Sequence, residues 1–122
     1  GDYELGSIEY AVEHLDCKLI VIMGHKDCGA IKAFISSNGH YNHPDHIKNI
    51  INYIEKESEE KSLKNTNNLT VDKAIDANIA HGVTFLKSAD PILKERFEQH
   101  KITIIGALYD IESGRVTFKN IK

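Results

Sequence analysis

The sequence predicts an α/β domain: a mostly parallel sheet with helices packed over it and an antiparallel hairpin at one edge. The run LIVIM at residues 19–23 is apolar at every position, which is typical of a strand covered on both faces. A second apolar run, rich in β-branched residues, occupies residues 102–111, and an ESG turn then leads to a partner strand at residues 115–120. Helical patterns fill the chain between the two runs, so the connection between the strands should cross over the sheet as helices.

Five stretches carry apolar residues at helical spacing, and helices are expected there. They cover residues 7–15, 29–36, 44–62, 70–88 and 90–99. Thr70 is suited to cap the fourth of these helices. The apolar stripe of that helix, which should face the core, comprises Ile75, Ile79, Val83 and Leu86. The charged run EKESEEKS at residues 55–62 predicts a solvated helix end.

Size, charge and cysteine content narrow the class of protein. A chain of 122 residues suits one compact domain, residues 1–122, and is too short for two. The net charge of −3, with basic residues scattered among acidic ones, argues against nucleic-acid binding. No apolar run approaches the roughly 20 residues that span a bilayer, and no signal peptide is evident, so we expect no membrane contact and a cytoplasmic location. Two cysteines are too few for a disulfide scaffold.

A histidine and a cysteine three residues apart stand out at the end of the first predicted strand. Ligands of α/β sheets bind beyond the carboxyl ends of strands, which is where His25 and Cys28 fall. Imidazole nitrogen and thiolate sulfur are ligands that zinc prefers. Cys28 also precedes a predicted helix, whose N-terminus favours the thiolate, the form that binds metal or acts as a nucleophile. The residues alone leave two hypotheses open: a zinc site, or a hydrolase with Cys28 as nucleophile and His25 as base.

Two longer segments resemble the β-class carbonic anhydrases. Residues 6–34, GSIEYAVEHLDCKLIVIMGHKDCGAIKAF, are similar to a helix, an apolar strand and a Gly-His-x-x-Cys-Gly motif of that family. Residues 104–118, IIGALYDIESGRVTF, are similar to its C-terminal strand pair. Together with the helices between them, these segments extend the resemblance over nearly the whole chain.

The resemblance implies a fold, a cofactor and a reaction. His25 and Cys28 would be two protein ligands of a catalytic zinc ion, with Gly24 and Gly29 allowing the tight turn around them. The implied reaction is the reversible hydration of carbon dioxide to bicarbonate, for which zinc activates a water molecule. Active members of the family are dimers or larger assemblies, so a homodimer or higher homo-oligomer is expected.

The chain departs from the family upstream of these motifs. Members carry a Cys-x-Asp-x-Arg motif whose cysteine is the third zinc ligand, and nothing in residues 1–122 matches it. Because a catalytic zinc typically has three protein ligands, this chain alone should hold zinc poorly and be inactive. We expect the natural protein to be longer at its N-terminus, and the strand at residues 19–23 to pair either with that part or with a second copy. The competing hypothesis is a non-catalytic carbonic anhydrase-like scaffold or oligomerisation module with a degenerate zinc site.

The other candidate residues receive ordinary interpretations. Three histidines share one polar segment: His40, His43 and His46. They could collect a metal ion, but Pro44 interrupts any regular backbone there, so a solvated loop is predicted. Packing or a local hydrogen bond explains Asn78 and His81 better than metal ligation does, and Cys17 is expected to be a buried, inert thiol. A hydrolase would need a third group to orient its base, and the sequence shows none.

Overall fold

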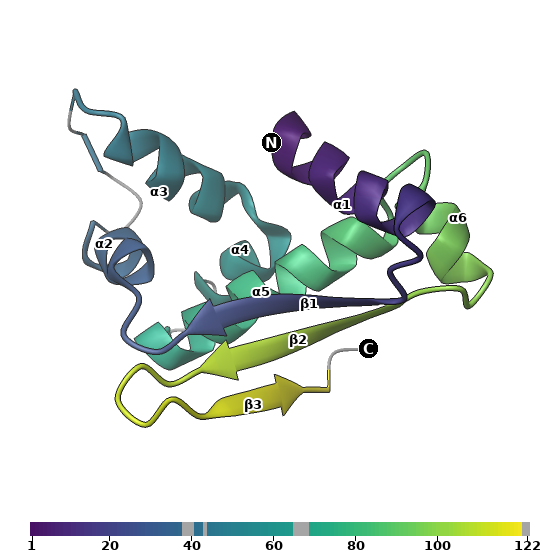
Figure 1. The fold of residues 1–122 in the computed structure, drawn as a ribbon. Coiled ribbons are helices and arrows are strands. Elements are labelled where there is room, and N and C mark those ends of the chain that lie inside the picture. The colour runs from purple at the N-terminus through teal and green to yellow at the C-terminus, as the bar shows by residue number, and fades with distance from the viewer. Residues whose placement is uncertain (38–40, 43, 65–68, 121–122) are drawn as a thin grey trace.

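The computed structural model describes residues 1–37, 41–42, 44–64 and 69–120 of the chain. The elements follow in the order α1 (Asp2–His14), β1 (Leu19–His25), α2 (Gly29–Ser36), α3 (Ile47–Lys56), α4 (Ser58–Lys64), α5 (Val71–Lys87), α6 (Leu93–Glu98), β2 (Thr103–Tyr109) and β3 (Val116–Lys119). Figure 1 shows α5 running along a small sheet, with α1 and α6 towards one end and α2 and α3 towards the other. None of the described helices is both long and apolar enough to cross a membrane.

Three strands form a mixed sheet in the order β1-β2-β3. β1 and β2 are parallel, with Leu19 opposite Thr103 and His25 opposite Tyr109. β2 and β3 are antiparallel neighbours, so the predicted edge hairpin is confirmed. The predicted α/β architecture is also confirmed, because helices connect the two parallel strands.

α5 is the central packing element. Thr70 caps it as predicted: the hydroxyl oxygen accepts a hydrogen bond from Lys73 N at 3.3 Å. The predicted apolar stripe of α5 is buried and divides between two clusters. The cluster shared with α2 and α3 contains Ile31, Phe34, Ile51, Ile54, Ala74, Ile75 and Ile79. The cluster shared with α1, α6 and the start of β2 contains Val12, Val83, Leu86, Leu93, Ile102 and Ile104.

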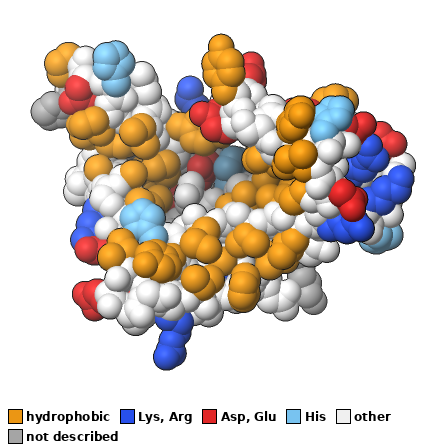
Figure 2. All heavy atoms as spheres, in the orientation of Figure 1, with side chains coloured by type: hydrophobic (Ala, Val, Ile, Leu, Met, Phe, Trp, Pro, Cys, Tyr) orange, Lys and Arg blue, Asp and Glu red, His pale blue; other side chains and the backbone are white. Residues whose placement is uncertain are grey.

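β1 is covered on one face only within the described part of the chain. Ile20 and Ile22 pack against the two clusters. Leu19 and Met23 alternate with them, point to the opposite face, and are each 52% exposed. The prediction that both faces are covered is wrong for the described residues. Their helices pack on the face of β1 that carries Ile20 and Ile22, and the face that carries Leu19 and Met23 is left exposed. Figure 2 shows hydrophobic side chains gathered over the region that β1 and β2 occupy in Figure 1.

A polypeptide of residues 1–122 is expected to self-associate through β1. No strand of the described residues pairs with the outer edge of β1, and an unpaired apolar edge pairs readily with another chain. Light scattering should give a mass above the 13.7 kDa of one chain. Met23→Lys places a charge beside the edge and should shift the polypeptide towards the monomer. Ile111→Lys, at a residue that is 59% exposed in the β2–β3 turn, is the matched control. A monodisperse monomer of the unaltered polypeptide would contradict this expectation.

The charged segment at residues 55–62 is not a solvated helix end, contrary to the prediction. α3 ends at Lys56, the backbone becomes extended at Glu57, and α4 begins at Ser58. α4 packs against α5, and Glu57 and Glu60 are only 2% and 0% exposed. The prediction failed because it treated the segment as the continuation of one straight helix, whereas the break at Glu57 turns the chain back onto α5.

Gly24 lies inside β1 and permits the close approach of α5. A Cβ atom at this position would lie 2.7 Å from Ile79 Cγ1 and 2.8 Å from Ile79 Cδ1. Since Ile79 is buried, Gly24→Ala is expected to destabilise the fold by about 1–3 kcal/mol, the usual cost of overpacking. Urea unfolding measures this cost, with Gly6→Ala as the control because open space surrounds Gly6 in α1. Equal changes in the two variants would show that the packing argument is wrong.

Candidate metal site at the end of the first strand

His25 and Cys28 lie at the carboxyl end of β1, where two regular elements position them. His25 is the last residue of the strand and is paired with Tyr109. Lys26 donates its backbone N–H to Tyr109 O at 2.8 Å, which extends the pairing with β2 by one residue. Cys28 is the N-cap of α2, and its carbonyl oxygen accepts a hydrogen bond from Lys32 N at 3.0 Å. The end of the strand and the start of the helix therefore fix the backbone on both sides of the turn.

The His25 imidazole is held in one tautomer. Its Nδ1 atom lies 3.1 Å from the backbone oxygen of Lys26. A carbonyl oxygen can only accept a hydrogen bond, so Nδ1 carries the proton and Nε2 keeps its lone pair. Metal-binding histidines commonly donate from one ring nitrogen and bind the ion with the other. The backbone thus leaves Nε2 of His25 available as a ligand atom.

The Cys28 thiol is half-buried beside the core cluster shared by α2, α3 and α5. It lines a cavity of about 520 Å³, most of whose walls are apolar side chains of α2 and α3. Asn78 of α5 supplies a polar group to the same cavity. The space beside the thiol is large enough for a small uncharged molecule together with several waters.

Asp27 rather than glycine shapes the turn between the two candidate ligands. Its backbone has a left-handed φ of 60°, a conformation that aspartate tolerates. Gly24 and Gly29 are not among the positive-φ residues of the described chain. The prediction that these two glycines permit the turn is therefore corrected: Gly24 allows α5 to approach β1, and Gly29 begins α2. The Asp27 carboxylate forms an ion pair with Lys32, which ties the turn to the first helical turn.

An aspartate of the β2–β3 turn flanks the site. Asp110 Oδ2 lies 3.7 Å from Lys26 Nζ. The Ser113 hydroxyl donates a hydrogen bond to Asp110 at 2.9 Å, and this bond, with the Glu112 N–H and the Lys26 charge, lowers the pKa of Asp110. The ionised carboxylate therefore links the residue after His25 to the β2–β3 turn.

The donor atoms at this site suit zinc in kind but not in number. Imidazole and thiolate are preferred zinc ligands, and a catalytic zinc typically has three protein ligands. Within residues 1–37, 41–42, 44–64 and 69–120, no group of three or more histidine, cysteine or acidic side chains is placed to hold a metal ion. A zinc site built on His25 and Cys28 would therefore have two ligand atoms from the described residues, and a third would have to come from outside them.

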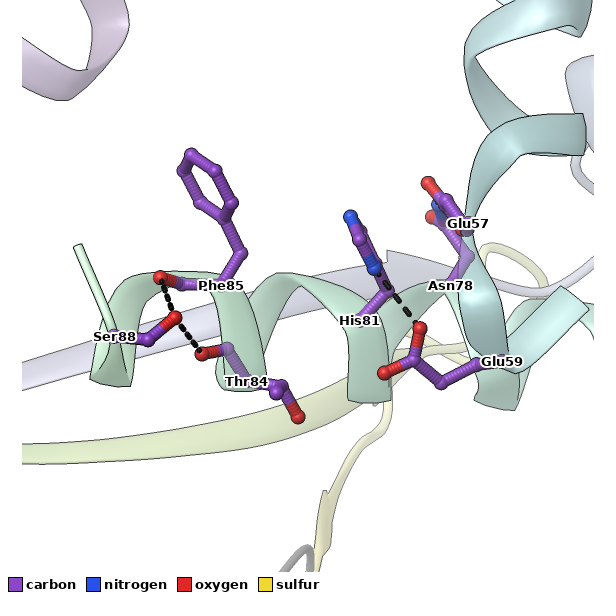
Figure 3. Close-up of polar contacts among 7 residues, drawn as sticks. All are labelled: Glu57, Glu59, Asn78, His81, Thr84, Phe85 and Ser88. Atoms are coloured by element: carbon purple, nitrogen blue, oxygen red, sulfur yellow. Dashed lines mark hydrogen bonds and ion pairs between the residues drawn. The ribbon is translucent and has the colours of Figure 1, made fainter.

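A cluster of carboxyl groups where α3 and α4 meet α5 was not predicted from the sequence (Figure 3). Asn78 Nδ2 donates to both carboxylate oxygens of Glu57, at 2.9 and 3.2 Å. His81 Nδ1 lies 2.9 Å from Glu59 Oε2. Both carboxyl oxygens of Glu60 are buried with no hydrogen-bond partner among the described residues. Asn78 and His81 were expected to pack or to form a local hydrogen bond. The hydrogen bonds that they form are not local, because their partners lie 21 and 22 residues away, on α4 or just before it.

Burial raises the pKa of two of these carboxyl groups. For Glu57, desolvation outweighs the hydrogen bond from Asn78 and raises the pKa. For Glu60, desolvation and the nearby Glu57 and Glu59 charges raise the pKa to about 8. Glu60 is therefore mainly protonated at neutral pH. The available sequence signal was the spacing of Glu57 and Glu60 at three and six residues after the buried Ile54.

The remaining sequence candidates lie away from this site or beyond what the structure describes. His40 and His43 are outside the described residues, so metal binding by the segment that they share with His46 stays a prediction. Cys17 is half-buried rather than fully buried, and its thiol donates to the Leu19 carbonyl at 3.3 Å. Cys17 precedes β1 and Cys28 follows it, and both thiols are free.

Sequence comparison relates the chain to known enzymes. A family model described as "Carbonic anhydrase" matches residues 2–116. The chain is 28% identical over 118 residues to carbonic anhydrase 2 of Mycobacterium tuberculosis, which covers 95% of this chain and 56% of the relative. It is 30% identical over 112 residues to a carbonic anhydrase of Candida albicans, covering 89% of this chain and 39% of the relative. The chain thus spans about half the length of these relatives or less.

Solved structures with low sequence identity share the fold. The β-carbonic anhydrase CcaA superposes with a TM-score of 0.78 at 22% identity, covering 94% of this chain and 57% of that chain. One of two tetrameric β-carbonic anhydrases from Sordaria macrospora superposes with a TM-score of 0.75 at 22% identity, covering 98% of this chain and 61% of that chain. At identities this low, the superpositions show a shared fold and do not show a shared activity.

Proposed function

The chain belongs to the β-class carbonic anhydrase family, and from that premise we propose that the protein containing it catalyses the reversible hydration of carbon dioxide to bicarbonate. The observation that carries the proposal is the pair of candidate ligands at the carboxyl end of β1. Nε2 of His25 keeps its lone pair because Nδ1 donates to a backbone oxygen, and the Cys28 thiol follows on the next element.

We propose that His25 Nε2 and Cys28 Sγ bind zinc. When bound, zinc supplies a Lewis acid that makes water nucleophilic near neutral pH. The residues of this chain contribute orientation and shape: the Lys26 carbonyl fixes the imidazole ring, and the mostly apolar cavity beside Cys28 suits an uncharged substrate such as carbon dioxide. The Asp27–Lys32 ion pair braces the turn that carries both ligands.

The third zinc ligand is proposed to lie in a part of the protein upstream of these residues. Two observations support this: the described residues hold no group of three potential ligands, and the chain corresponds to 56% of the M. tuberculosis relative. The free edge and exposed face of β1 suit a neighbouring strand from the same part. A homo-oligomeric assembly is also proposed, supported by the tetrameric relatives from Sordaria macrospora.

A non-catalytic scaffold is the second candidate, and the shortage of ligands within the described residues favours it. A Cys–His hydrolase has less support. The imidazole of His25 is oriented by a backbone carbonyl, which stabilises an imidazolium less than the carboxylate that commonly orients a general base.

Metal analysis and stopped-flow carbon dioxide hydration on the full-length polypeptide test the proposal. We expect one zinc per chain, and an activity that is lost with a strong chelator and restored by zinc. A folded, metal-free and inactive protein would support the scaffold instead. Activity that survives the chelator but is lost on thiol alkylation would support a hydrolase. Intact-mass measurement of the natural protein tests the upstream segment, since a value near 13.7 kDa would exclude it.

A further inference from the structure

α4 is a short helix that carries a fully buried acid. It packs on α5 after the extended backbone at Glu57 and has only seven residues. Both carboxyl oxygens of Glu60 are buried and have no hydrogen-bond partner among the described residues. A buried carboxyl group without partners is much less unfavourable as the neutral acid than as the anion. The contact between α4 and α5 is therefore most stable while Glu60 carries its proton.

The charged neighbours of Glu60 strengthen this dependence. The charges of Glu57 and Glu59 act in the same direction as burial, and together these effects raise the pKa of Glu60 to about 8. Across the contact, α5 presents Asn78 to Glu57 and His81 to Glu59 (Figure 3). Both α5 side chains therefore hold carboxyl groups next to Glu60 and leave Glu60 itself without a partner.

The two helices that contact α4 supply no buried counter-ion for this acid. Helix α3 ends with the charged residues Glu55 and Lys56, and Lys56 is exposed. Helix α5 carries Lys73, which is exposed, and Asp76, which pairs with Lys119 of β3 at 3.0 Å. None of the lysines in α3 and α5, both fully described, is buried. An ionised Glu60 would therefore stay uncompensated as long as α4 remains packed.

The packing of α4 on α5 is also incomplete. A cavity of about 460 Å³ lies between Leu63 of α4, Ala77 and Ala80 of α5, and the end of β3. Part of the interface is therefore not filled by side chains. A segment with few buried apolar contacts opens locally at a lower free energy than the rest of a domain. α4 is thus suited to separate from α5 without unfolding of the core.

Asn78 links α4 to the cavity beside Cys28. Its amide donates to both carboxylate oxygens of Glu57, at 2.9 and 3.2 Å, and the same residue lines the 520 Å³ cavity together with Cys28. Glu57 is the joint between α3 and α4. A movement of α4 would therefore disturb this contact and, with it, a polar part of the cavity wall.

We propose that α4 is a pH-sensitive latch: loss of the Glu60 proton releases α4 from α5 and frees Asn78 beside the Cys28 cavity. In the released state water solvates the Glu60 carboxylate, so the anion no longer carries the cost of burial. The O–H bond of the acid breaks, the proton passes to solvent, and no other covalent bond changes. The release concerns only the pairing of two helices and is independent of the reaction proposed above.

The direction and range of the response follow from the two states of Glu60. In the released helix this group should titrate near its ordinary pKa of 4.5, and in the packed helix its pKa is about 8. Between these values a rise in pH favours the released state, by up to about tenfold per pH unit. The response levels off above about pH 8, where the packed state also loses the proton. The raised pKa of Glu57 acts in the same direction.

A purely structural role does not require an acid at this position. A hydrogen bond or an ion pair would explain a buried glutamate, but the Glu60 oxygens form neither within the described residues. An apolar side chain would occupy the same space without burying two unpaired oxygens. What the acid adds is a contact whose stability depends on pH.

Amide hydrogen exchange of the full-length polypeptide between pH 5 and 9 tests the latch. The probe is the Lys61 amide, which donates to Glu57 O at 3.0 Å. After correction for intrinsic exchange rates, its protection should be lower than that of the buried α5 residues Val83 and Leu86, and insensitive to low urea. Its protection should fall about 100-fold or more between pH 5 and 8 and change little above pH 8. The Asn78 side-chain amide should lose protection together with it.

Three variants assign the response to one group. Glu60→Gln resembles the neutral acid, so the protection of its α4 amides should fall much less with pH, with the remaining fall due to Glu57. His81→Gln keeps a donor for Glu59 and should retain the steep fall, which separates titration of the imidazole from that of Glu60. Glu98→Gln, on the exposed side of α6, is the matched control and should behave like the unaltered protein.

Each part of the latch can fail separately in these measurements. Equal protection of α4 and the α5 core at every pH would overturn the latch, because α4 would then open only with the whole domain. An unchanged pH dependence in Glu60→Gln, or its loss in His81→Gln, would overturn the assignment to Glu60. An Asn78 amide that stays protected while α4 opens would overturn the link to the cavity. All these measurements are made without turnover, so they are independent of any carbon dioxide hydration activity.

Discussion

Cys28→Ser in the full-length polypeptide is expected to lose bound zinc and at least about 100-fold of its carbon dioxide hydration activity. Cys28 Sγ is one of the two proposed ligand atoms, and the described residues hold no group of three potential ligands. Serine keeps the size of the side chain but presents a hydroxyl, which stays protonated at neutral pH and binds zinc poorly. Changes in the shell outside the ligands already cost about 10–100-fold, so the loss of a ligand should cost more. His25→Ala should have the same effect, because Nε2 is the other proposed ligand atom.

Cys17→Ser is the matched control for this substitution. Cys17 is also a half-buried free thiol, but it precedes β1 and bonds to the Leu19 carbonyl, a contact that a hydroxyl can replace. Zinc content and hydration rate should be unchanged in this variant. The two measurements should move together: a Cys28→Ser protein that keeps one zinc per chain and full activity would exclude the proposed ligand set. A protein that keeps zinc but loses activity would point to thiol chemistry instead.

Local patterns predicted the elements of the fold well, because they depend on neighbours in the sequence. The cap at Thr70 and the apolar stripe of α5 follow from residues within the helix itself. The position of His25 and Cys28 at a strand end could also be predicted, since a strand that stops at a turn before a helix is a local feature. Which face of the strand is covered depends on parts of the chain that are distant in the sequence. Met23 is half-exposed because the described helices pack on the other side of β1.

The carboxyl cluster lay beyond sequence reasoning for a related reason. Glu59 and His81 are 22 residues apart, and only the packing of α4 on α5 brings them together. A run of charged residues usually forms a solvated face, and this general tendency failed at the break after Lys56. The role of Gly24 could not be predicted from its neighbours in the sequence either. A side chain there would collide with Ile79, which lies 55 positions further along the chain. The residues whose roles are hardest to predict are therefore those whose partners are supplied by the tertiary fold.

The free energy of unfolding is expected to fall as the pH rises from about 5 to 8, because Glu60 is buried as an acid. Its pKa is raised to about 8 in the folded protein, from an ordinary value of 4.5. Between these values the unfolded chain releases the Glu60 proton while the folded chain retains it, so a higher pH favours unfolding. The stabilisation is fully present below about pH 4.5 and is lost by about pH 8. At about 1.4 kcal/mol per unit of pKa, the loss between pH 4.5 and 7 is on the order of 3 kcal/mol. The raised pKa of Glu57 acts in the same direction.

Glu60→Gln and Glu60→Leu separate the charge from the unpaired polar atoms. Glutamine resembles the protonated acid, so this variant should match the unaltered protein near pH 5 and exceed it in stability near pH 8. Leucine also removes the buried oxygens that lack partners, and should add about 1–3 kcal/mol at every pH. Urea unfolding at several pH values measures both effects, with Glu98→Gln on the exposed side of α6 as the control that keeps the original pH dependence. If the free energy of unfolding of Glu60→Gln fell in parallel with that of the unaltered protein up to pH 8, a different group would be responsible for the loss of stability. A much shallower fall for Glu60→Gln would instead assign most of that loss to the Glu60 proton, with the remaining fall due to Glu57.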